Sequence, residues 1–116
     1  MSPMQRSIAW LKQSGYHVAK LERWNAWAKI RQDIWGADLL AFIPVEEGWE
    51  VIPRQIYLIQ VTTTANISAR QKKILSIPEA AAWVKAGHRF VVHGWSKKGP
   101  RGKRKTWQLT EREILV

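Results

Sequence analysis

Apolar residues recur at helical spacing near the start of the chain. Met4, Ile8 and Leu11 are three or four positions apart, and they follow the run Ser2-Pro3-Met4-Gln5. In that run, Ser with Gln three positions later forms a capping box, and Pro is common at the first position of a helix. The pattern therefore predicts an amphipathic helix that ends before Gly15.

Five later stretches have the apolar and β-branched content of strands. Two of them are nearly continuous apolar runs, which is typical of strands buried on both faces. Pro44 and the turn signal Glu46-Glu47-Gly48 end the first of these runs, so we expect the two strands to pair as a hairpin. The stretches are residues 16–23, 37–43, 56–62, 89–95 and 105–109, and the two apolar runs are the second and third.

Two helices are expected between the third and fourth stretches. Ser68-Ala69-Arg70-Gln71 and Ser76-Ile77-Pro78-Glu79 both fit a capping box, and Gly87 is a typical stop signal. The Trp-rich basic stretch at residues 24–35 has no clear periodicity, and its conformation stays open. The mixed order of helices and strands predicts an α/β or α+β fold, and the length of 116 residues predicts one domain, 1–116.

The charge of the chain narrows the range of partners. Lys and Arg number 19 against 9 Asp and Glu, a net charge of +10, so nucleic acid is the first partner to consider. An anionic membrane is a weaker choice because the charge is spread over sheet and loop instead of along one amphipathic helix. No apolar run approaches about 20 residues and no secretory signal is recognised, so we expect a soluble, cytoplasmic protein that does not bind membranes.

Several classes of site are excluded by residue type. The chain has no Cys, which rules out disulfides, thiolate nucleophiles and Cys-based zinc sites. His17, His88 and His93 lack the spacing of a zinc motif, and we interpret them as strand residues with a satisfied hydrogen bond. No glycine loop of the Walker or Rossmann type occurs, so no nucleotide cofactor is implied. Most of the eight Trp rings are expected to be in the core or half-buried.

Two polar residues interrupt the apolar strands. Asp38 lies near the start of the first run and Gln60 lies within the second, and a buried polar group is costly unless something pairs with it. If the strands pair, a hard cation could be held by the Asp38 carboxylate, the Gln60 side-chain carbonyl, the backbone carbonyl of Val61 and waters. Such an ion would assist phosphodiester hydrolysis. The alternative is that Asp38 caps a turn and Gln60 lies on an exposed strand edge.

Three segments of the chain follow one another in the order Gly36-Ala37-Asp38-Leu39-Leu40-Ala41-Phe42, Leu58-Ile59-Gln60-Val61-Thr62-Thr63 and Ser68-Ala69-Arg70-Gln71-Lys72-Lys73-Ile74. Their order and spacing resemble the core of the PD-(D/E)XK, or restriction-endonuclease-like, nuclease superfamily. The similarity is closest to small phage and archaeal Holliday junction resolvase-like nucleases, and it covers nearly the whole chain. It implies an α/β fold with a restriction-endonuclease-like core, in which a central mixed β-sheet is flanked by helices.

The resemblance also implies roles for individual residues. Asp38 matches the metal-binding Asp of the family, Gln60 matches its Glu, and Thr62 matches its Lys. Glu22 matches the extra N-terminal Glu of the resolvase branch. The implied cofactor is Mg²⁺ or Mn²⁺, held by Asp38, Gln60 and the backbone carbonyl of Val61. Asp33, five positions before Asp38, is a further candidate ligand that could instead pair with Arg31.

Two of these positions depart from the family pattern. Gln60 is neutral, so the site should hold a divalent ion more weakly than a site with Glu. Thr62 cannot supply the cation that stabilises the transition state, and we assign it to hold a water. Arg70, Lys72 or Lys73 could supply that cation from the following helix, and Lys73 is preferred. The alternative is that these three form a solvated basic helix face.

Two basic stretches are candidates for phosphate contacts. The loop between the last two strands could lie on duplex phosphates, which would give salt-dependent and largely sequence-independent affinity, or it could simply be a solubilising loop. The second stretch, residues 20–31, contains Trp24 and Trp27, whose rings could hold an unpaired base but are expected to pack in the core. The expected nucleic-acid contacts are Arg23, Lys29, Arg31, Arg70, Lys72, Lys97, Lys98, Arg101, Lys103, Arg104 and Lys105.

The expected function is that of a divalent-metal-dependent DNA endonuclease, and the resemblance implies a Holliday junction or other branched or duplex DNA as substrate. A homodimer is expected because junction resolution in this family uses two active sites. The alternative is a DNA-binding protein on the same fold that has lost catalysis through the replacements at Gln60 and Thr62. The expected catalytic residues are Glu22, Asp38, Gln60, Thr62 and Lys73.

Overall fold

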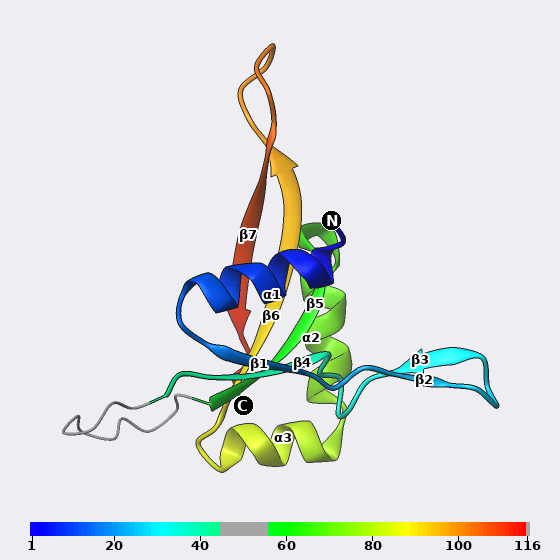
Figure 1. Ribbon diagram of the computed structural model, residues 1–116. Coiled ribbons are helices and arrows are strands. Elements are labelled where there is room, and N and C mark those ends of the chain that lie inside the picture. The colour runs from blue at the N-terminus through cyan, green and yellow to red at the C-terminus, as the bar shows by residue number, and fades with distance from the viewer. Residues whose placement is uncertain (45–55, 116) are drawn as a thin grey trace.

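A five-stranded mixed sheet forms the centre of the molecule (Figure 1). The computed structural model describes residues 1–44 and 56–115. The strands lie in the order β1-β4-β5-β6-β7, and a separate hairpin, β2–β3, projects away from the sheet. The elements are α1 Pro3–Gln13, β1 His17–Lys20, β2 Arg23–Asn25, β3 Ile30–Gln32, β4 Leu39–Phe42, β5 Ile56–Thr63, η1 Thr64–Asn66, α2 Ile67–Leu75, α3 Pro78–Lys85, β6 Arg89–Lys98 and β7 Thr106–Glu113.

The directions of the strands follow from the connections between them. Strands β5 and β6 run parallel, whereas all other neighbours in the sheet run antiparallel. A parallel pair requires a crossover connection, which η1, α2 and α3 provide here. The predicted α/β class, with a central mixed sheet flanked by helices, is confirmed. The predicted pairing of the two apolar strands, now β4 and β5, is confirmed as well.

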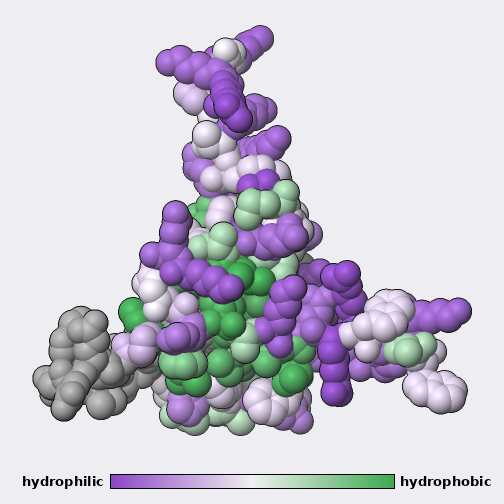
Figure 2. Space-filling view, viewed as in Figure 1, coloured by the Kyte–Doolittle hydropathy of each residue, from purple (hydrophilic) through white to green (hydrophobic). Residues whose placement is uncertain are grey.

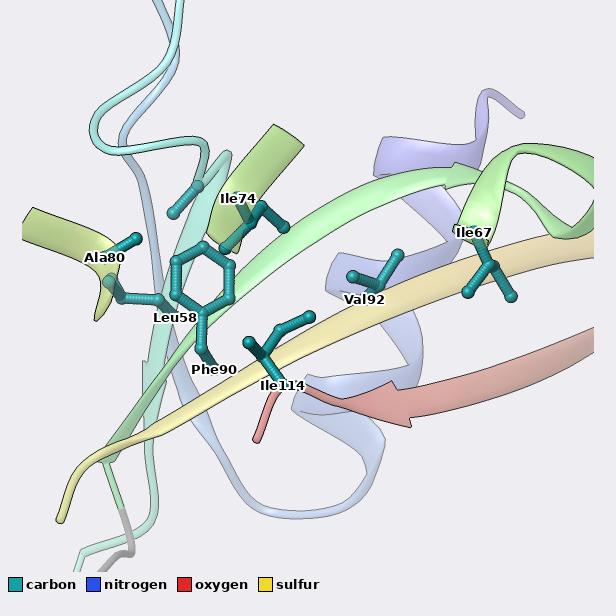
Figure 3. Packing of buried hydrophobic residues seen from close by; sticks show 8 residues of the cluster. Leu58, Ile67, Ile74, Ala80, Phe90, Val92 and Ile114 are labelled. Carbon is teal, nitrogen blue, oxygen red and sulfur yellow. The ribbon is translucent and has the colours of Figure 1, made fainter. Parts of the chain in front are cut away.

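Helices cover both faces of the sheet. Side chains alternate between the faces along a strand, so β5 places Tyr57 and Ile59 against α1 and Leu58 against α2 and α3. Figure 3 shows the second cluster, in which Phe90 of β6 lies close to Leu58. The α1 cluster contains Leu11, Leu39, Ala41, Tyr57, Ile59 and Val91, and the α2/α3 cluster contains Ala37, Leu58, Ile67, Ile74, Ala80, Phe90, Val92 and Ile114.

Strand β6 and the start of α2 come unusually close at Gly94. A Cβ atom at this position would lie 2.7 Å from Ile67 Cγ1 and 2.9 Å from Thr64 Cα. Real Cβ atoms do not approach other heavy atoms so closely, so a residue without a side chain is required. Gly94 therefore allows α2 to begin directly against the sheet.

The start of α1 forms as predicted. The backbone N–H of Gln5 donates to Ser2 Oγ at 3.2 Å, and the Gln5 side-chain oxygen accepts from the backbone N–H of Ser2 at 2.9 Å. These two bonds are the reciprocal pair of a capping box. The helix ends at Gln13, and Gly15 follows with a φ of 91°, a conformation that Gly adopts without steric cost.

The capping boxes predicted for the two later helices are wrong. Helix α2 begins at Ile67, directly after η1, so Ser68 is inside the helix and no side chain caps its start. Ser76 is the C-cap of α2, and its hydroxyl donates to the backbone carbonyl of Lys73 at 2.6 Å. Pro78 does begin α3. No helix in residues 1–44 and 56–115 is long and apolar enough to cross a membrane.

Several strands differ in extent from their predicted ranges. The first strand ends at Lys20 instead of continuing to residue 23, and the Trp-rich stretch left open forms the β2–β3 hairpin. The expectation that β4 is buried on both faces is wrong at its end, because Phe42 is 43% exposed. Strands β6 and β7 extend beyond the predicted ranges to form a long hairpin (Figure 1). The turn predicted at residues 46–48 lies outside the described residues.

The expectation that most Trp rings are in the core or half-buried is wrong for the β2–β3 hairpin. Trp95 is buried at 7% exposure, and Trp10 and Trp83 are partly buried. The other four described rings are exposed: Trp24 at 60%, Trp27 at 98%, Trp35 at 44% and Trp107 at 39%. Two of these four, Trp24 and Trp27, belong to the β2–β3 hairpin, which is separate from the five-stranded sheet and projects away from it. Trp49 lies outside the described residues.

Candidate active site

A tight turn places Asp38 directly before the first residue of β4. Ile34 and Ala37 exchange two backbone hydrogen bonds of 3.1 and 2.8 Å, and the two residues between them, Trp35 and Gly36, have φ values of 54° and 82°. Positive φ at both central residues is the requirement of a type I′ turn, which matches the twist of paired strands. Asp38 follows this turn immediately, so its backbone position is set before β4 begins.

Asp38 and Gln60 meet across the antiparallel pair β4/β5. The carboxylate oxygen Oδ2 of Asp38 accepts from Gln60 Nε2 at 2.7 Å and from the backbone N–H of Val61 at 2.9 Å. Asp38 is 7% exposed and Gln60 is 4% exposed. The alternative in which Gln60 lies on an exposed strand edge is therefore wrong. Strand β5 is central in the sheet, with β4 and β6 on either side.

Burial makes Asp38 an unusual carboxyl group. Loss of hydration raises its pKa from 3.8 to about 6, although the hydrogen bond from the Val61 backbone acts in the opposite direction. The negative charges of Glu22 and Asp33 raise the pKa further, and the Arg70 guanidinium lowers it. Asp38 consequently stays protonated to a higher pH than an ordinary Asp. A perturbed carboxyl group inside a cavity is a typical feature of functional sites.

All the predicted catalytic and metal-binding residues line one cavity of about 480 Å³, and two of the predicted nucleic-acid contacts line it as well. The cavity lies between the start of α1, the β4/β5 edge, the β3 strand and α2. The predicted residues in it are up to 51 positions apart in the sequence (from 22 to 73) and come from separate elements. The predicted residues in its lining are Glu22, Arg31, Asp33, Asp38, Gln60, Val61, Thr62, Arg70 and Lys73.

Two oxygen atoms of this site are available to a cation. Gln60 turns its N–H₂ group toward Asp38, because an ionised carboxylate only accepts hydrogen bonds. Its other terminal atom, Oε1, is buried and has no hydrogen-bond partner among the residues described, and such a buried acceptor costs about 1–3 kcal/mol. The second available oxygen is Oδ1 of Asp38, because both hydrogen bonds found for that carboxylate end on Oδ2.

These oxygens fit a hard cation, which takes carboxylate, amide and backbone carbonyl ligands. Across residues 1–44 and 56–115, no group of three acidic or His side chains is placed to hold a metal. The predicted ligand set does not require such a group, because it combines one carboxylate with two neutral oxygens. A cation at the Val61 carbonyl would compete with the long hydrogen bond, 3.5 Å, that this carbonyl accepts from Gln60 Nε2, whereas Gln60 Oε1 has no such bond.

Glu22 lies beside Asp38 but outside the strand on which it was predicted. It follows β1, and its backbone N–H and that of Leu21 donate to the Asp38 carbonyl at 3.3 and 2.8 Å. Its carboxylate pairs with the Arg31 guanidinium at 3.5 Å. Because the Arg31 side chain is 74% exposed, this pair contributes about 0–1 kcal/mol at most. The pair links the β2–β3 hairpin to the cavity.

Helix α2 supplies two cations to the cavity. Arg70 and Lys73 are three positions apart, so they lie on the same side of the helix and both reach the lining. Lys72 is exposed on α2 and does not line the cavity. Lys72 and Lys73 are both exposed, as a solvated face requires, but Arg70 is only partly exposed, and Arg70 and Lys73 also border the cavity.

The remaining predicted nucleic-acid contacts lie on two projecting hairpins. Figure 2 shows hydrophilic residues gathered at the tip of the β6–β7 hairpin. All six predicted basic residues there are exposed, namely Lys97, Lys98, Arg101, Lys103, Arg104 and Lys105. The β2–β3 hairpin carries Arg23, Lys29 and Arg31, which are exposed as well. The Trp24 and Trp27 rings of this hairpin do not pack in the core, contrary to expectation.

Four lining residues were not anticipated. Ser2, Pro3 and Met4 come from the start of α1, and Thr63 follows Thr62 on β5. Thr63 could have been inferred from its place at the end of the apolar run. For the start of α1, no signal was available, because its position over the β5 end depends on packing between distant segments.

The histidines take no part in this cavity. His93 is fully buried on the α1 side, where its Nδ1 lies 3.0 Å from Ser7 Oγ, and Ser7 Oγ also accepts from Trp95 Nε1 at 2.8 Å. His93 Nε2 lies 3.6 Å from Glu111 Oε2, and this proximity lowers the pKa of Glu111. His93 is thus a hydrogen-bonded strand residue, as predicted. His17 stacks on Phe42.

Comparisons of this chain with protein-family models, with curated proteins and with solved structures found no match.

Proposed function

We propose that this chain is a divalent-metal-dependent DNA endonuclease with a PD-(D/E)XK core, and that it acts on branched DNA such as a Holliday junction. The observation that carries the proposal is the Asp38 cavity. A buried carboxyl group, the Gln60 amide and the cations Arg70 and Lys73 line the same space. The chain order also supports it, because β4 and β5 pair antiparallel and β5 connects through α2 to a parallel β6.

Mg²⁺ or Mn²⁺ would be held by the Asp38 carboxylate, Gln60 Oε1 and the backbone carbonyl of Val61. When bound, such an ion offsets negative charge on the phosphate and lowers the pKa of the attacking water. Above a pH of about 6, Asp38 is ionised and able to act as a ligand. The Thr62 hydroxyl, 8% exposed in the lining, can accept from or donate to a water.

The cations of α2 take the role of the Lys that Thr62 replaces. Arg70 acts on Asp38 through its charge and lies in the lining, so it can pair with a phosphodiester brought next to Asp38. Lys73 lines the same cavity and adds a second positive charge. Positive charge placed beforehand where negative charge develops stabilises the transition state of phosphoryl transfer.

The basic tip of the β6–β7 hairpin would hold DNA phosphates at a distance from the cavity. Contacts of this kind position the DNA without reading its sequence. Cutting both strands of a junction requires two cavities, because one chain contributes one Asp38. A homodimer is therefore part of the proposal, and sedimentation of the protein with and without junction DNA measures it.

A second candidate is a DNA-binding protein on the same fold that has lost catalysis. One observation favours it: Gln60 presents an N–H donor to Asp38 at 2.7 Å, where a Glu would present a further negative oxygen. Asp38 and Gln60 are thus hydrogen-bonded to each other through Oδ2 and Nε2 without an ion. In this case the chain would bind branched DNA and leave it intact.

The test is cleavage of a labelled four-way junction and of matched linear duplex, with Mg²⁺ or Mn²⁺, by the wild type and by D38N. Asn is isosteric with Asp, and its single side-chain oxygen can accept both hydrogen bonds that Asp38 Oδ2 accepts. E79Q is the control, since Glu79 is an exposed carboxylate on α3 that does not line the cavity.

Paired cuts near the branch point that persist in E79Q and vanish in D38N are the expected result. Cleavage that survives in D38N contradicts the proposed site. Junction DNA that is bound but uncut by wild type, D38N and E79Q alike, with either ion, favours the binding protein.

A further inference from the structure

The β2–β3 hairpin exposes large apolar side chains far from any core. Trp27 is 98% exposed, Trp24 is 60% exposed and Ile30 is 50% exposed. Apolar surface in water costs free energy in proportion to its area, so neighbouring exposed rings usually mark a binding surface. In Figure 1 the hairpin extends away from the sheet, with no helix on either side of it.

The tip of this hairpin has a defined backbone shape. The side-chain oxygen of Asn25 accepts from the backbone N–H of Trp27 at 3.0 Å and from that of Ala28 at 3.1 Å. Lys29 has a φ of 53° and closes the turn into β3. Side-chain to backbone bonds of this type hold a turn in place. The backbone at Trp27 is therefore held in one conformation, which lowers the backbone entropy lost when a partner binds.

The basic side chains of the hairpin indicate which class of partner it would bind. Arg23, Lys29 and Arg31 are exposed alongside the two rings. Cations interleaved with exposed aromatic rings match a single strand of nucleic acid, in which phosphates and base faces alternate. In a duplex the base faces are covered by their neighbours, so the rings would find no partner there.

The hairpin is continuous with the Asp38 cavity. A hollow of about 270 Å³ next to that cavity is lined by Lys20, Arg23 and Trp24. The two hollows share Met4, Glu22 and Arg31 in their linings. A strand whose phosphate enters the Asp38 cavity would thus meet basic side chains and then the Trp24 ring in the adjoining hollow.

We propose that the β2–β3 hairpin binds unpaired DNA bases next to the Asp38 cavity, with Trp24 and Trp27 as the rings on which these bases stack. The substrate class is DNA with a single-stranded stretch beside the phosphate to be cut, such as an opened branch point. This inference rests on the proposed function in taking DNA as the substrate. It goes further in assigning the β2–β3 hairpin to bases and leaving duplex phosphates to the β6–β7 tip.

The test measures binding of a labelled single-stranded oligonucleotide and of a blunt duplex of equal length, with a chelator present so that no cleavage occurs. W27L keeps an apolar side chain and removes the ring, whereas W27F keeps a ring. F42L is the control, because Phe42 is another exposed ring, which stacks on His17 at the end of β4 and lines neither hollow. At 98% exposure, replacement of Trp27 should leave the fold intact, which the circular dichroism of each variant checks.

W27L should weaken single-strand binding by about tenfold, equal to about 1.4 kcal/mol and within the range for one base stacked on an aromatic ring. Duplex binding should change less than about twofold, and W27F should recover most of the loss. The slope of the logarithm of the binding constant against the logarithm of the salt concentration should be the same in wild type and W27L, because a stacked base releases no counterions.

Equal affinity of W27L and wild type for the single strand overturns the inference. An equal loss of affinity for single strand and duplex overturns it too. So does a change in the sedimentation of W27L without a change in DNA binding, because the hairpin would then be a contact between copies of the chain. These results do not depend on cleavage. If W27L weakens single-strand binding but the protein cuts no DNA, only the proposed endonuclease is removed. If the protein cuts DNA in an Asp38-dependent way but W27L binds the single strand as the wild type does, only this inference is removed.

Discussion

Replacing Asp38 by Asn should stabilise the metal-free protein at neutral pH. Asp38 is 7% exposed and its pKa is raised to about 6 in the folded state, against 3.8 for an ordinary Asp. The unfolded state therefore loses its proton at lower pH than the folded state does. As the pH rises from about 4 to about 6, the free energy of unfolding falls, and above that range the loss is complete.

The size of the effect follows from the two pKa values. The difference between 3.8 and about 6 corresponds to about 3 kcal/mol at about 1.4 kcal/mol for each pH unit. The Asn side chain of D38N does not titrate, and it can keep the hydrogen bonds from Gln60 and Val61. D38N should thus match the wild type near pH 4 and exceed it by about 3 kcal/mol at pH 7.

Urea unfolding of both proteins from pH 4 to pH 8, with a chelator present, measures this difference. The two proteins share every other charged group, so the difference between their unfolding free energies reports mainly on position 38. With an m-value of about 2 kcal/mol/M, D38N should unfold about 1.5 M higher in urea at pH 7. E79Q should instead lose about 0.3–1 kcal/mol, because Glu79 lies in the first turn of α3. A D38N difference that is absent, or that does not change with pH, refutes the reasoning on Asp38 burial.

Three further variants test separate parts of the structure. G94A should cost about 1–3 kcal/mol in urea unfolding, because its Cβ would overlap Ile67; wild-type stability would show that α2 does not depend on this close approach. K103A/R104A should lower DNA affinity and reduce the salt slope by up to about 2, with cleavage at saturating DNA unchanged; an unchanged slope would remove the β6–β7 tip from the interface. S7A leaves two buried partners unpaired and should cost about 1–3 kcal/mol with no effect on DNA affinity; a neutral S7A would mean that these partners are satisfied in another way.

Local patterns in the sequence were enough for the features that depend on near neighbours. The capping box of α1 involves Ser2 and Gln5 only, and it forms as predicted. The apolar runs of β4 and β5 were recognised because a strand between two neighbours must be apolar on most of its surface. Their pairing then placed Asp38 against Gln60, since a polar residue within each run has few other places to go.

The sequence by itself thus determined the order of the main elements and the pairing of β4 with β5, while its patterns left both an α/β and an α+β class open and made the meeting of Asp38 with Gln60 one of two alternatives. Only the tertiary structure decided that Arg70 and Lys73 reach the cavity while Lys72 does not, because this depends on how α2 is rotated against the sheet. It also decided that Trp24 and Trp27 are exposed. Composition favours burial of a Trp ring, but burial requires a second layer, and the β2–β3 hairpin extends beyond every layer of the fold.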